Sequence, residues 1–363
     1  MKLKYIDALR GIAIIMVIIV HTSQYGKSLY NSTIGLVLGQ GARGVQLFYM
    51  ASAFTLLLSY NYRKGKEKQA TRNFFIRRFF RIAPMYYLGI VYYIFQNGLG
   101  PRYWLADVSE ITFSNILANI LFVHGVNPYW ITSLVPGGWS ITVEMFFYAL
   151  FPILMLRIKS LSSALNFTIL SLLFLFLIKF FLVGNPLISS SRLWEEFLFL
   201  FFPSQLPVFG LGMIAYYIVI EKQKTLSTLN IILISLMFLS QFLLKQYIPG
   251  HILISVFFLI FICFIAKYPF LFFVNKITQF IGKISYSAYL VHFAVLFWLK
   301  KYNLVDYFEI TTQVDSLINL LIRFLIVLFF TVIISYATFT LVEKPFMNLG
   351  KRIILKLNGD AVN

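Results

Sequence analysis

The sequence predicts an all-α protein, a polytopic transmembrane helical bundle. Of its 363 residues, 60% are hydrophobic and only 12% are charged, and the mean hydropathy is +0.81. A soluble domain of average composition has roughly a quarter of its residues charged. Apolar stretches long enough to cross a bilayer follow one another with short connections, which leaves no room for a soluble domain of ordinary size.

Ten stretches are apolar enough to be spans. They lie near residues 8–22, 42–60, 82–97, 139–156, 163–183, 197–220, 229–245, 251–266, 284–299 and 317–342. The first has no small-residue cleavage site after it, so we expect an uncleaved anchor. A possible eleventh stretch at 111–125 is shorter and more polar, and it is either a span or a helix in the membrane interface.

Charge distribution favours ten spans. If 111–125 does not cross, most Lys and Arg residues fall on one side, which the positive-inside rule assigns to the cytoplasm together with both termini. If it crosses, every later loop is inverted and most of the later basic residues move outside. We therefore expect 98–138 to be an outer segment with an interfacial or re-entrant helix. The net charge of +18 reflects this topology and anionic ligands on one face, and nucleic acid is not an expected partner.

The first apolar stretch, YIDALRGIAIIMVIIVH, contains two ionisable groups, Arg10 and His21. Such groups are expensive inside a membrane and therefore indicate a functional site. On a helix that rises about 1.5 Å per residue they stand roughly 16 Å apart. Arg10 can thus lie at the cytoplasmic mouth of a site while His21 lies deep in the bilayer.

Glu144, near the start of the fourth expected span, reaches the same outer half of the membrane as His21. A neutral histidine with a carboxylate on one ring nitrogen is the usual form of a general base, because the partner fixes the tautomer and stabilises the imidazolium. We therefore expect Glu144 to orient His21, with Arg10 as the third functional group. Each residue alone could instead be a structural hydrogen-bonding group.

Three arginines, Arg77, Arg78 and Arg81, lead directly into Pro84 and the third span. Guanidinium forks suit phosphate oxygens. Since Arg10 enters the bilayer from the same side, we expect the four arginines to converge on one phosphorylated ligand; the alternative is a topology determinant and nothing more. The preceding basic run at 63–68 has the ordinary character of a solvated juxtamembrane segment attracted to anionic lipid.

Other polar residues inside spans have less specific interpretations. His292 either lines a cavity or makes an interhelical hydrogen bond. Arg323 should have a partner or face a polar cavity. Pro345 is explained by termination of the last span. The single Cys263 excludes disulfides, and the four His residues show no close spacing with carboxylates, so no metal site is predicted.

Six blocks in order resemble the acyltransferase 3 family of integral membrane acyltransferases. They are YIDALRGIAIIMVIIVH, GVQLFYMASAF at 44–54, FIRRFFRIAPMYYL at 75–88, GWSITVEMFFYALFP at 138–152, IGKISYSAYLVHF at 281–293 and LVEKPF at 341–346. Two positions depart from the family pattern. Ala53 stands where a glycine is usual, and Met145 leaves Glu144 as a single acid where many relatives have a pair.

The resemblance implies an acyltransferase in a bacterial plasma membrane. It would move an acyl group, usually acetyl, from cytoplasmic acyl-CoA to a hydroxyl of an extracytoplasmic surface polysaccharide or glycolipid. The acyl-CoA is a co-substrate, and no permanently bound cofactor is implied. Arg10, Arg77, Arg78 and Arg81 would hold the CoA phosphates. Some relatives carry a C-terminal esterase-like domain, whereas here we expect one membrane acyltransferase domain over residues 1–363.

Two mechanisms and one rival function stay open at this point. His21 acts either as general base on the acceptor hydroxyl or as a transient acyl carrier, with Glu144 orienting it. Trp139, Ser140 and His292 could contact the acceptor, although Trp139 is also an ordinary interface anchor. The rival function is a transporter or flippase for a polysaccharide or lipid-linked sugar, which inverted repeats or paired broken helices would favour. Neither is evident in the sequence.

Overall fold

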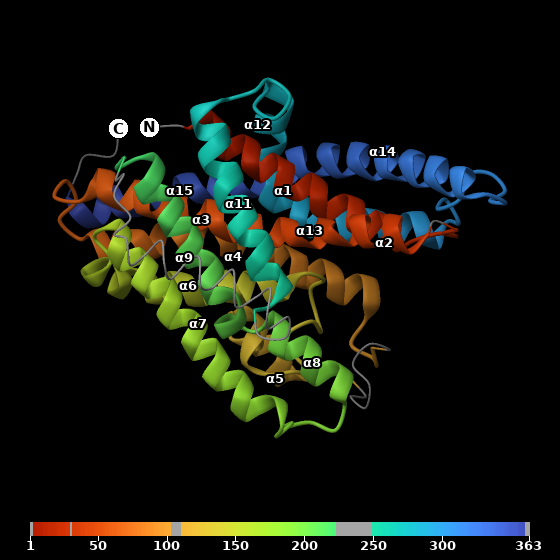
Figure 1. Cartoon of the computed structure of the whole chain (residues 1–363), viewed down its shortest axis with the longest axis horizontal. Helices are drawn as coiled ribbons and strands as arrows, with labels where there is room; N and C mark the ends of the chain where they lie inside the picture. Colours follow the sequence, from red (N-terminus) through yellow and green to blue (C-terminus); the bar gives the residue numbers. More distant parts are fainter. Residues whose placement is uncertain (1–2, 30, 103–109, 223–247, 360–363) are drawn as a thin grey trace. The chain divides into compact units, whose positions relative to one another are not determined.

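The computed structural model describes residues 3–29, 31–102, 110–222 and 248–359, and every regular element in these ranges is a helix (Figure 1). The chain divides into two compact units. Residues 1–48, 79–86 and 267–363 form unit 1, and residues 49–78 and 87–266 form unit 2. The predicted all-α class is confirmed for the part of the chain that the structure describes.

Unit 1 contains α1 (Lys4–Ser23), the helix of Arg10 and His21. It packs against α12 (Lys276–Lys283), α13 (Ser285–Lys301) and α14 (Gln313–Thr338). Its buried side chains include Leu9, Ala13 and Val17, which recur every four residues and so form one continuous apolar stripe. The other elements of this unit are α2 (Ser32–Gly39), η1 (Gln40–Arg43), η4 (Phe339–Glu343) and α15 (Lys344–Asn358).

Two glycines set the distance between α1 and α12. A Cβ atom added to Gly11 would lie 2.0 Å from the carbonyl oxygen of Thr278, and one added to Gly282 would lie 1.7 Å from that of Asp7. No side chain fits at such distances, so the two backbones touch. Close approach of this kind lets α12 lie directly on the first half of α1.

Unit 2 is arranged around α9 (Phe202–Val219), a largely buried helix. The ring of Phe209 stacks on Phe147 with centroids 3.9 Å apart and on Tyr49 at 4.6 Å, so three helices share one aromatic core. The surrounding helices are most of α3 (Gly44–Arg63) and α4 (Ala70–Asn97), then α5 (Phe113–Ile120), η3 (His124–Val126), α6 (Gly138–Arg157), α7 (Leu161–Val183), α8 (Ser191–Leu200) and α11 (Gly250–Lys267).

The expected ten spans are reproduced only in part. Within the described residues six helices are long and apolar enough to cross a membrane, or seven if the pair α12 and α13, bent by 79°, is one span. The expected stretches at 42–60 and 82–97 are helical, but α4 begins at Ala70 and includes the arginines before residue 82. The expected span at 229–245 lies outside the described residues.

The polar stretch at 111–125 does not form one long helix. It folds as α5, eight residues, followed by a turn and η3. Eight helical residues rise only about 12 Å, well short of the roughly 30 Å of a hydrocarbon core. This agrees with an interfacial or re-entrant helix, and the count of ten spans stays a prediction.

The last expected span does not end at Pro345. Helix α14 continues through the π-helical η4 into α15, and Pro345 stands in the first turn of α15. The wider π turn accommodates a proline, which lacks the N–H and would otherwise interrupt the ladder. Termination was thus the wrong interpretation of this residue.

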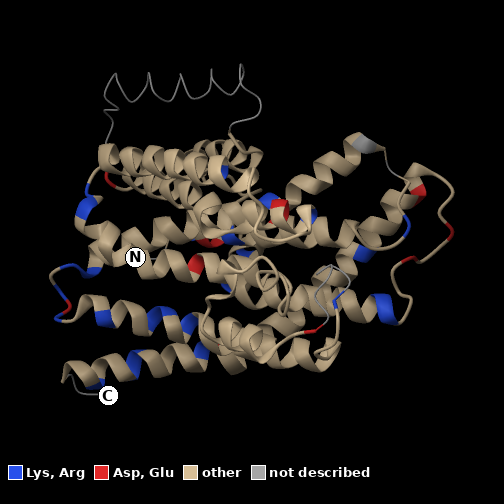
Figure 2. Cartoon of the chain, turned by 90° about the horizontal axis from the view of Figure 1, so that it is seen from below, with Lys and Arg blue, Asp and Glu red and all other residues tan. Residues whose placement is uncertain are grey.

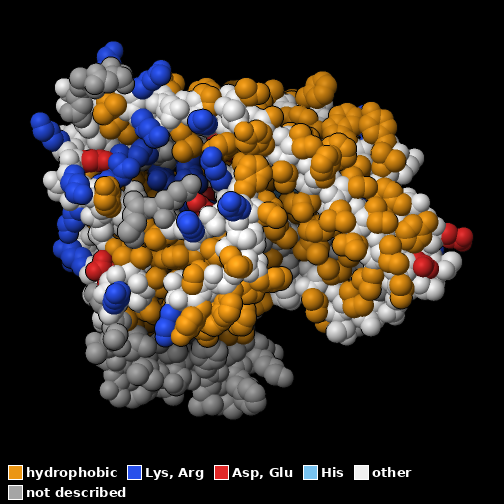
Figure 3. Space-filling view, turned by 90° about the horizontal axis from the view of Figure 1, so that it is seen from above, with side chains coloured by type: hydrophobic (Ala, Val, Ile, Leu, Met, Phe, Trp, Pro, Cys, Tyr) orange, Lys and Arg blue, Asp and Glu red, His pale blue; other side chains and the backbone are white. Residues whose placement is uncertain are grey.

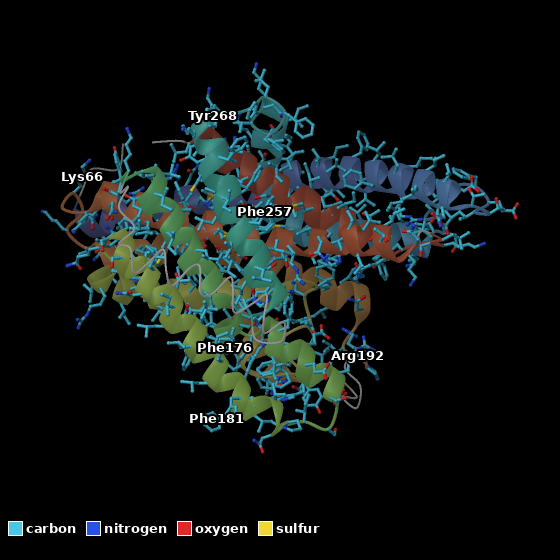
Figure 4. All side chains as sticks on the ribbon, viewed as in Figure 1. Lys66, Phe176, Phe181, Arg192, Phe257 and Tyr268 are labelled. Carbon is cyan, nitrogen blue, oxygen red and sulfur yellow. The ribbon has the colours of Figure 1, made fainter. Side chains whose placement is uncertain are left out.

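Large hydrophobic side chains remain exposed on several helices, and they cover broad areas in Figure 3. Phe181 on α7 is 63% exposed and Phe257 on α11 is 64% exposed, both labelled in Figure 4. Lys and Arg instead occur in short groups separated by long uncharged stretches (Figure 2). Apolar exposure of this extent is typical of helices that face lipid.

Candidate active site

The first component of the candidate site is the pair His21 and Gln24 at the end of α1. His21 Nδ1 lies 3.2 Å from Gln24 Oε1. Because an amide oxygen only accepts hydrogen bonds, His21 donates from Nδ1 and keeps an unshared electron pair on Nε2. This is the tautomer that a general base requires, and a neighbour on the same helix sets it.

The second component is His292, which lies on α13 and is fully buried. Its ring centroid lies 5.4 Å from that of His21, and both rings pack on Phe293, at 4.0 Å and 4.5 Å respectively. His292 Nδ1 donates to the carbonyl oxygen of Ala288 at 3.1 Å. Its Nε2 has no hydrogen-bond partner among the described residues, so it is a buried acceptor beside His21.

A third component, Arg323 of α14, fixes the chain just after His21. Its side chain is 2% exposed and forms an ion pair with Asp306 at 2.7 Å. The same guanidinium donates to the carbonyl oxygens of Thr22 and Tyr25, which flank Gln24 in the sequence. The prediction that Arg323 has a partner is confirmed, and the partners show that it holds the segment carrying Gln24.

Glu144 lies in unit 2, on α6, and has its own donors. Ser52 Oγ donates to Glu144 Oε1 at 2.6 Å, and the hydroxyl of Tyr148 donates to the same oxygen. The guanidinium of Arg78 lies over the ring of Tyr148, 5.6 Å from its centroid. The structure therefore brings Glu144 and Arg78 together through Tyr148, a contact that sequence spacing did not predict.

Arg77 is held by a carboxylate in unit 2. Both of its terminal nitrogens donate to Glu67, each at 3.0 Å, and Arg63 donates to the same carboxylate at 2.6 Å. Burial alone would raise the pKa of Glu67, but hydrogen bonds and charges from Arg63 and Arg77 outweigh it and lower the pKa below its ordinary value. Glu67 is therefore ionised at neutral pH, and Arg63 belongs to a defined site rather than to a solvated run.

The expected acceptor contacts near the start of α6 are partly occupied by protein. Ser140 is buried, and its hydroxyl donates to the carbonyl oxygen of Gly137 at 3.0 Å. Its own carbonyl oxygen accepts a hydrogen bond from the hydroxyl of Tyr49, whose ring meets Trp139 edge-on with centroids 6.3 Å apart. Trp139 also packs against a hydrophobic cluster, which favours an anchoring role.

The predicted site residues fall into both units. Arg10, His21, Arg81 and His292 lie in unit 1, and Arg77, Arg78, Trp139, Ser140 and Glu144 lie in unit 2. The structure brings His21 to His292 in one unit and Arg78 to Glu144 in the other. The predicted pairing of His21 with Glu144 and the predicted convergence of four arginines stay predictions. In the described ranges, no three His, Cys, Asp or Glu side chains gather as metal ligands would.

Sequence reasoning missed two residues. Gln24 lies three positions after His21, a spacing that places two side chains on one helix face, and this signal was available. Glu67 is the only acid in the basic stretch from 61 to 84. An isolated carboxylate among so many cations is a candidate ion-pair partner, although which arginine it binds depends on the turn between α3 and α4.

These observations define a helical protein with membrane-compatible helices, a pair of neighbouring histidines of which His292 is buried, and an arginine–carboxylate cluster. Residues 3–340 match the model of the acyltransferase domain family, acyltransferase 3. The chain belongs to this family, as the sequence blocks predicted.

Curated relatives are more distant. A Staphylococcus aureus (strain COL) protein named "Putative O-acetyltransferase" is 26% identical over 387 residues, which cover 96% of this chain and 58% of that protein. The Caenorhabditis elegans "Regulator of hypoxia-inducible factor 1" is 28% identical over 176 residues, 42% of this chain and 34% of that protein. The chain thus spans well under two thirds of the length of these relatives. No solved structure matches it.

Proposed function

We propose that this chain is a membrane O-acyltransferase in which His21 promotes acyl transfer to a hydroxyl group. The observation that supports this most directly is the contact between His21 Nδ1 and Gln24 Oε1, which leaves Nε2 available as a base. Family membership supports the reaction class. The buried acceptor on His292 beside His21 adds a group that can bind a hydroxyl or amide hydrogen.

The substrates we propose are a cytoplasmic acyl-CoA, with acetyl as the acyl group, and a hydroxyl of an extracytoplasmic polysaccharide or glycolipid. The name of the Staphylococcus aureus relative, an O-acetyltransferase, is consistent with acetyl transfer. Arg10, Arg77, Arg78 and Arg81 would bind the CoA phosphates, since guanidinium groups match phosphate oxygens. Trp139, Ser140 and His292 would contact the acceptor.

In the general-base mechanism, His21 Nε2 takes the proton of the acceptor hydroxyl while its oxygen attacks the thioester carbonyl carbon. The carbon–sulfur bond breaks, and the imidazolium then gives this proton to the CoA thiolate, which yields the ester and free CoA. His292 Nε2 would accept a hydrogen bond from a neighbouring acceptor hydroxyl. The role proposed for Glu144 is to stabilise the imidazolium.

In the carrier mechanism, His21 Nε2 attacks the thioester carbonyl carbon, the carbon–sulfur bond breaks and CoA leaves as the thiolate. The acceptor oxygen then attacks the acyl-imidazole, the bond between the acyl carbon and Nε2 breaks, and the hydroxyl proton passes to the imidazole and from it to the thiolate. The two mechanisms differ in whether the protein carries label before any acceptor is present. Purified protein mixed with radiolabelled acetyl-CoA alone would retain label under neutral quenching only in the carrier mechanism.

The proposal is tested by ester formation from radiolabelled acetyl-CoA and cell-envelope glycan. We expect His21→Ala to lower the rate by about 10²–10⁴-fold, the range for loss of a general base. Gln24→Leu removes the group that fixes the tautomer and should cost about tenfold, the equivalent of one hydrogen bond of roughly 1.4 kcal/mol. Gln24→Glu keeps an acceptor and should restore the rate. Equal ester yields from wild type and His21→Ala would refute the proposal.

A further inference from the structure

The turn between α3 and α4 contains a compact anion site that a protein carboxylate occupies. Arg77 forms a bidentate hydrogen-bonded pair with both carboxylate oxygens of Glu67, and Arg63 donates to one of these oxygens. The side chains of Glu67 and Arg77 are 15% and 17% exposed, whereas that of Arg63 is 41% exposed. The amide of Asn73, which is buried, lies 3.4 Å from the second carboxylate oxygen. All four residues lie in unit 2.

The donor set is suited to more negative charge than it holds. Two guanidinium groups carry a charge of +2, and one carboxylate supplies −1, so the cluster keeps one positive charge. Planar guanidinium forks bind phosphate oxygens as they bind carboxylate oxygens, through paired and parallel N–H donors. A phosphate group with two negative charges would neutralise the cluster and offer three acceptor oxygens in place of two.

Release of Glu67 from this site would not unwind either helix. It lies outside both helices, in the connection between Arg63 and Ala70. Gly65, two residues earlier, has a φ of +78°, which glycine adopts readily, so the connection bends sharply there. Lysines at 64, 66 and 68 surround Glu67 in the sequence, and Lys66 lies on this turn (Figure 4). A released carboxylate would therefore remain close to cations and in contact with water.

We propose that Arg63 and Arg77 form a binding site for a phosphate group with two negative charges, and that Glu67 occupies this site when the ligand is absent. If the phosphate belongs to acyl-CoA, the inference rests on the proposed function. An anionic lipid headgroup could supply the same kind of phosphate group. Glu67 acts as an internal competitor, so ligand binding exchanges one anion for another and keeps the arginines from being left unpaired.

The test compares Glu67→Gln with wild type in nanodiscs of neutral phosphatidylcholine. CoA is titrated in one arm, and in the other arm phosphatidic acid is added to the lipid and its retention is measured. We expect Glu67→Gln to bind one of the two probes about tenfold more tightly, the factor that corresponds to about 1.4 kcal/mol. A gain for CoA identifies the soluble phosphate as the ligand, and a gain for phosphatidic acid identifies the lipid.

Three controls make the result specific. Glu195→Gln changes the net charge equally at an exposed position on α8 and should leave both affinities unchanged. Arg77→Gln added to Glu67→Gln should abolish the gain. Glu67→Asp keeps the charge on a shorter side chain and should give an intermediate gain, which tests the idea even if Glu67→Gln folds poorly.

The outcomes separate this inference from the proposed function. If wild type binds CoA but Glu67→Gln binds neither probe more tightly, Glu67 is a structural ion-pair partner and the inference is overturned. If wild type neither binds CoA nor forms ester, the proposed function fails, and a gain for phosphatidic acid would still support the anion site.

Discussion

Replacement of Arg323 by methionine should release the end of α1 that carries the His21–Gln24 pair. Methionine replaces the aliphatic stem of arginine with an unbranched apolar chain and removes every N–H donor of the guanidinium. Those donors bind the carbonyl oxygens of Thr22 and Tyr25, the carbonyl oxygen of Val305 at 2.5 Å, and Asp306 at 2.7 Å. Three backbone acceptors and one carboxylate would each lose a hydrogen-bond donor in a single substitution.

The size of the effect follows from burial. Removal of one partner from a buried ion pair costs about 3–5 kcal/mol, mainly because the other charge is left uncompensated. Arg323 is 2% exposed, but Asp306 is 33% exposed and also accepts a hydrogen bond from the backbone N–H of Lys27. Since water can solvate part of Asp306, we expect the low end of the range, about 3 kcal/mol.

Hydrogen exchange measures this directly. The amides of Gln24 and Tyr25 donate to carbonyl oxygens within the held segment, so their exchange reports its opening. A loss of about 3 kcal/mol corresponds to exchange roughly a hundredfold faster. Arg192→Met, at an exposed arginine of α8, is the matched control and should change neither amide. Unchanged exchange of residues 22–27 in Arg323→Met would refute the reasoning that Arg323 holds this segment.

Two further predictions concern packing and pH. Gly282→Ala places a methyl group 1.7 Å from the carbonyl oxygen of Asp7, so α12 must move from α1; we expect a loss of about 3 kcal/mol or more in stability, and a melting temperature equal to that of wild type would contradict the close contact. His124 donates from Nε2 to the carbonyl oxygen of Gly138 at 3.1 Å, and burial lowers its pKa to about 4. Because the folded pKa lies below the unfolded value of 6.5, protonation of His124 favours the unfolded state. The free energy of unfolding is therefore at its full value above pH 6.5 and falls by up to about 3 kcal/mol as the pH falls towards 4. After correction for the intrinsic pH dependence of amide exchange, the protection of residues 118–138 should therefore fall between pH 6.5 and 4 in wild type and less steeply in His124→Gln.

Composition and periodicity were sufficient for the class and for most helices. Long continuous apolar stretches satisfy their backbone groups in a membrane as helices, whereas spanning strands alternate apolar and polar residues, so the all-α class follows from the hydropathy pattern. The polarity and short length of 111–125 likewise predicted an interfacial or re-entrant helix, and the eight residues of α5 agree with this. The ordered blocks predicted the family, since they depend on local residue types rather than on packing.

The partners of the functional side chains were decided only by the tertiary structure. Within unit 1, Gln24 binds His21, and within unit 2, Ser52 and Tyr148 bind Glu144, and the sequence predicted neither set of contacts. The predicted pairing of Glu144 with His21 stays a prediction. Depth along a helix gives one coordinate of a side chain, whereas a hydrogen bond also requires the right face and distance. The same limit applies to Arg77. The spacing of the arginines indicated a cation at the inner face, but only the path of the turn after α3 brings the Glu67 carboxylate within hydrogen-bonding distance of the Arg77 guanidinium.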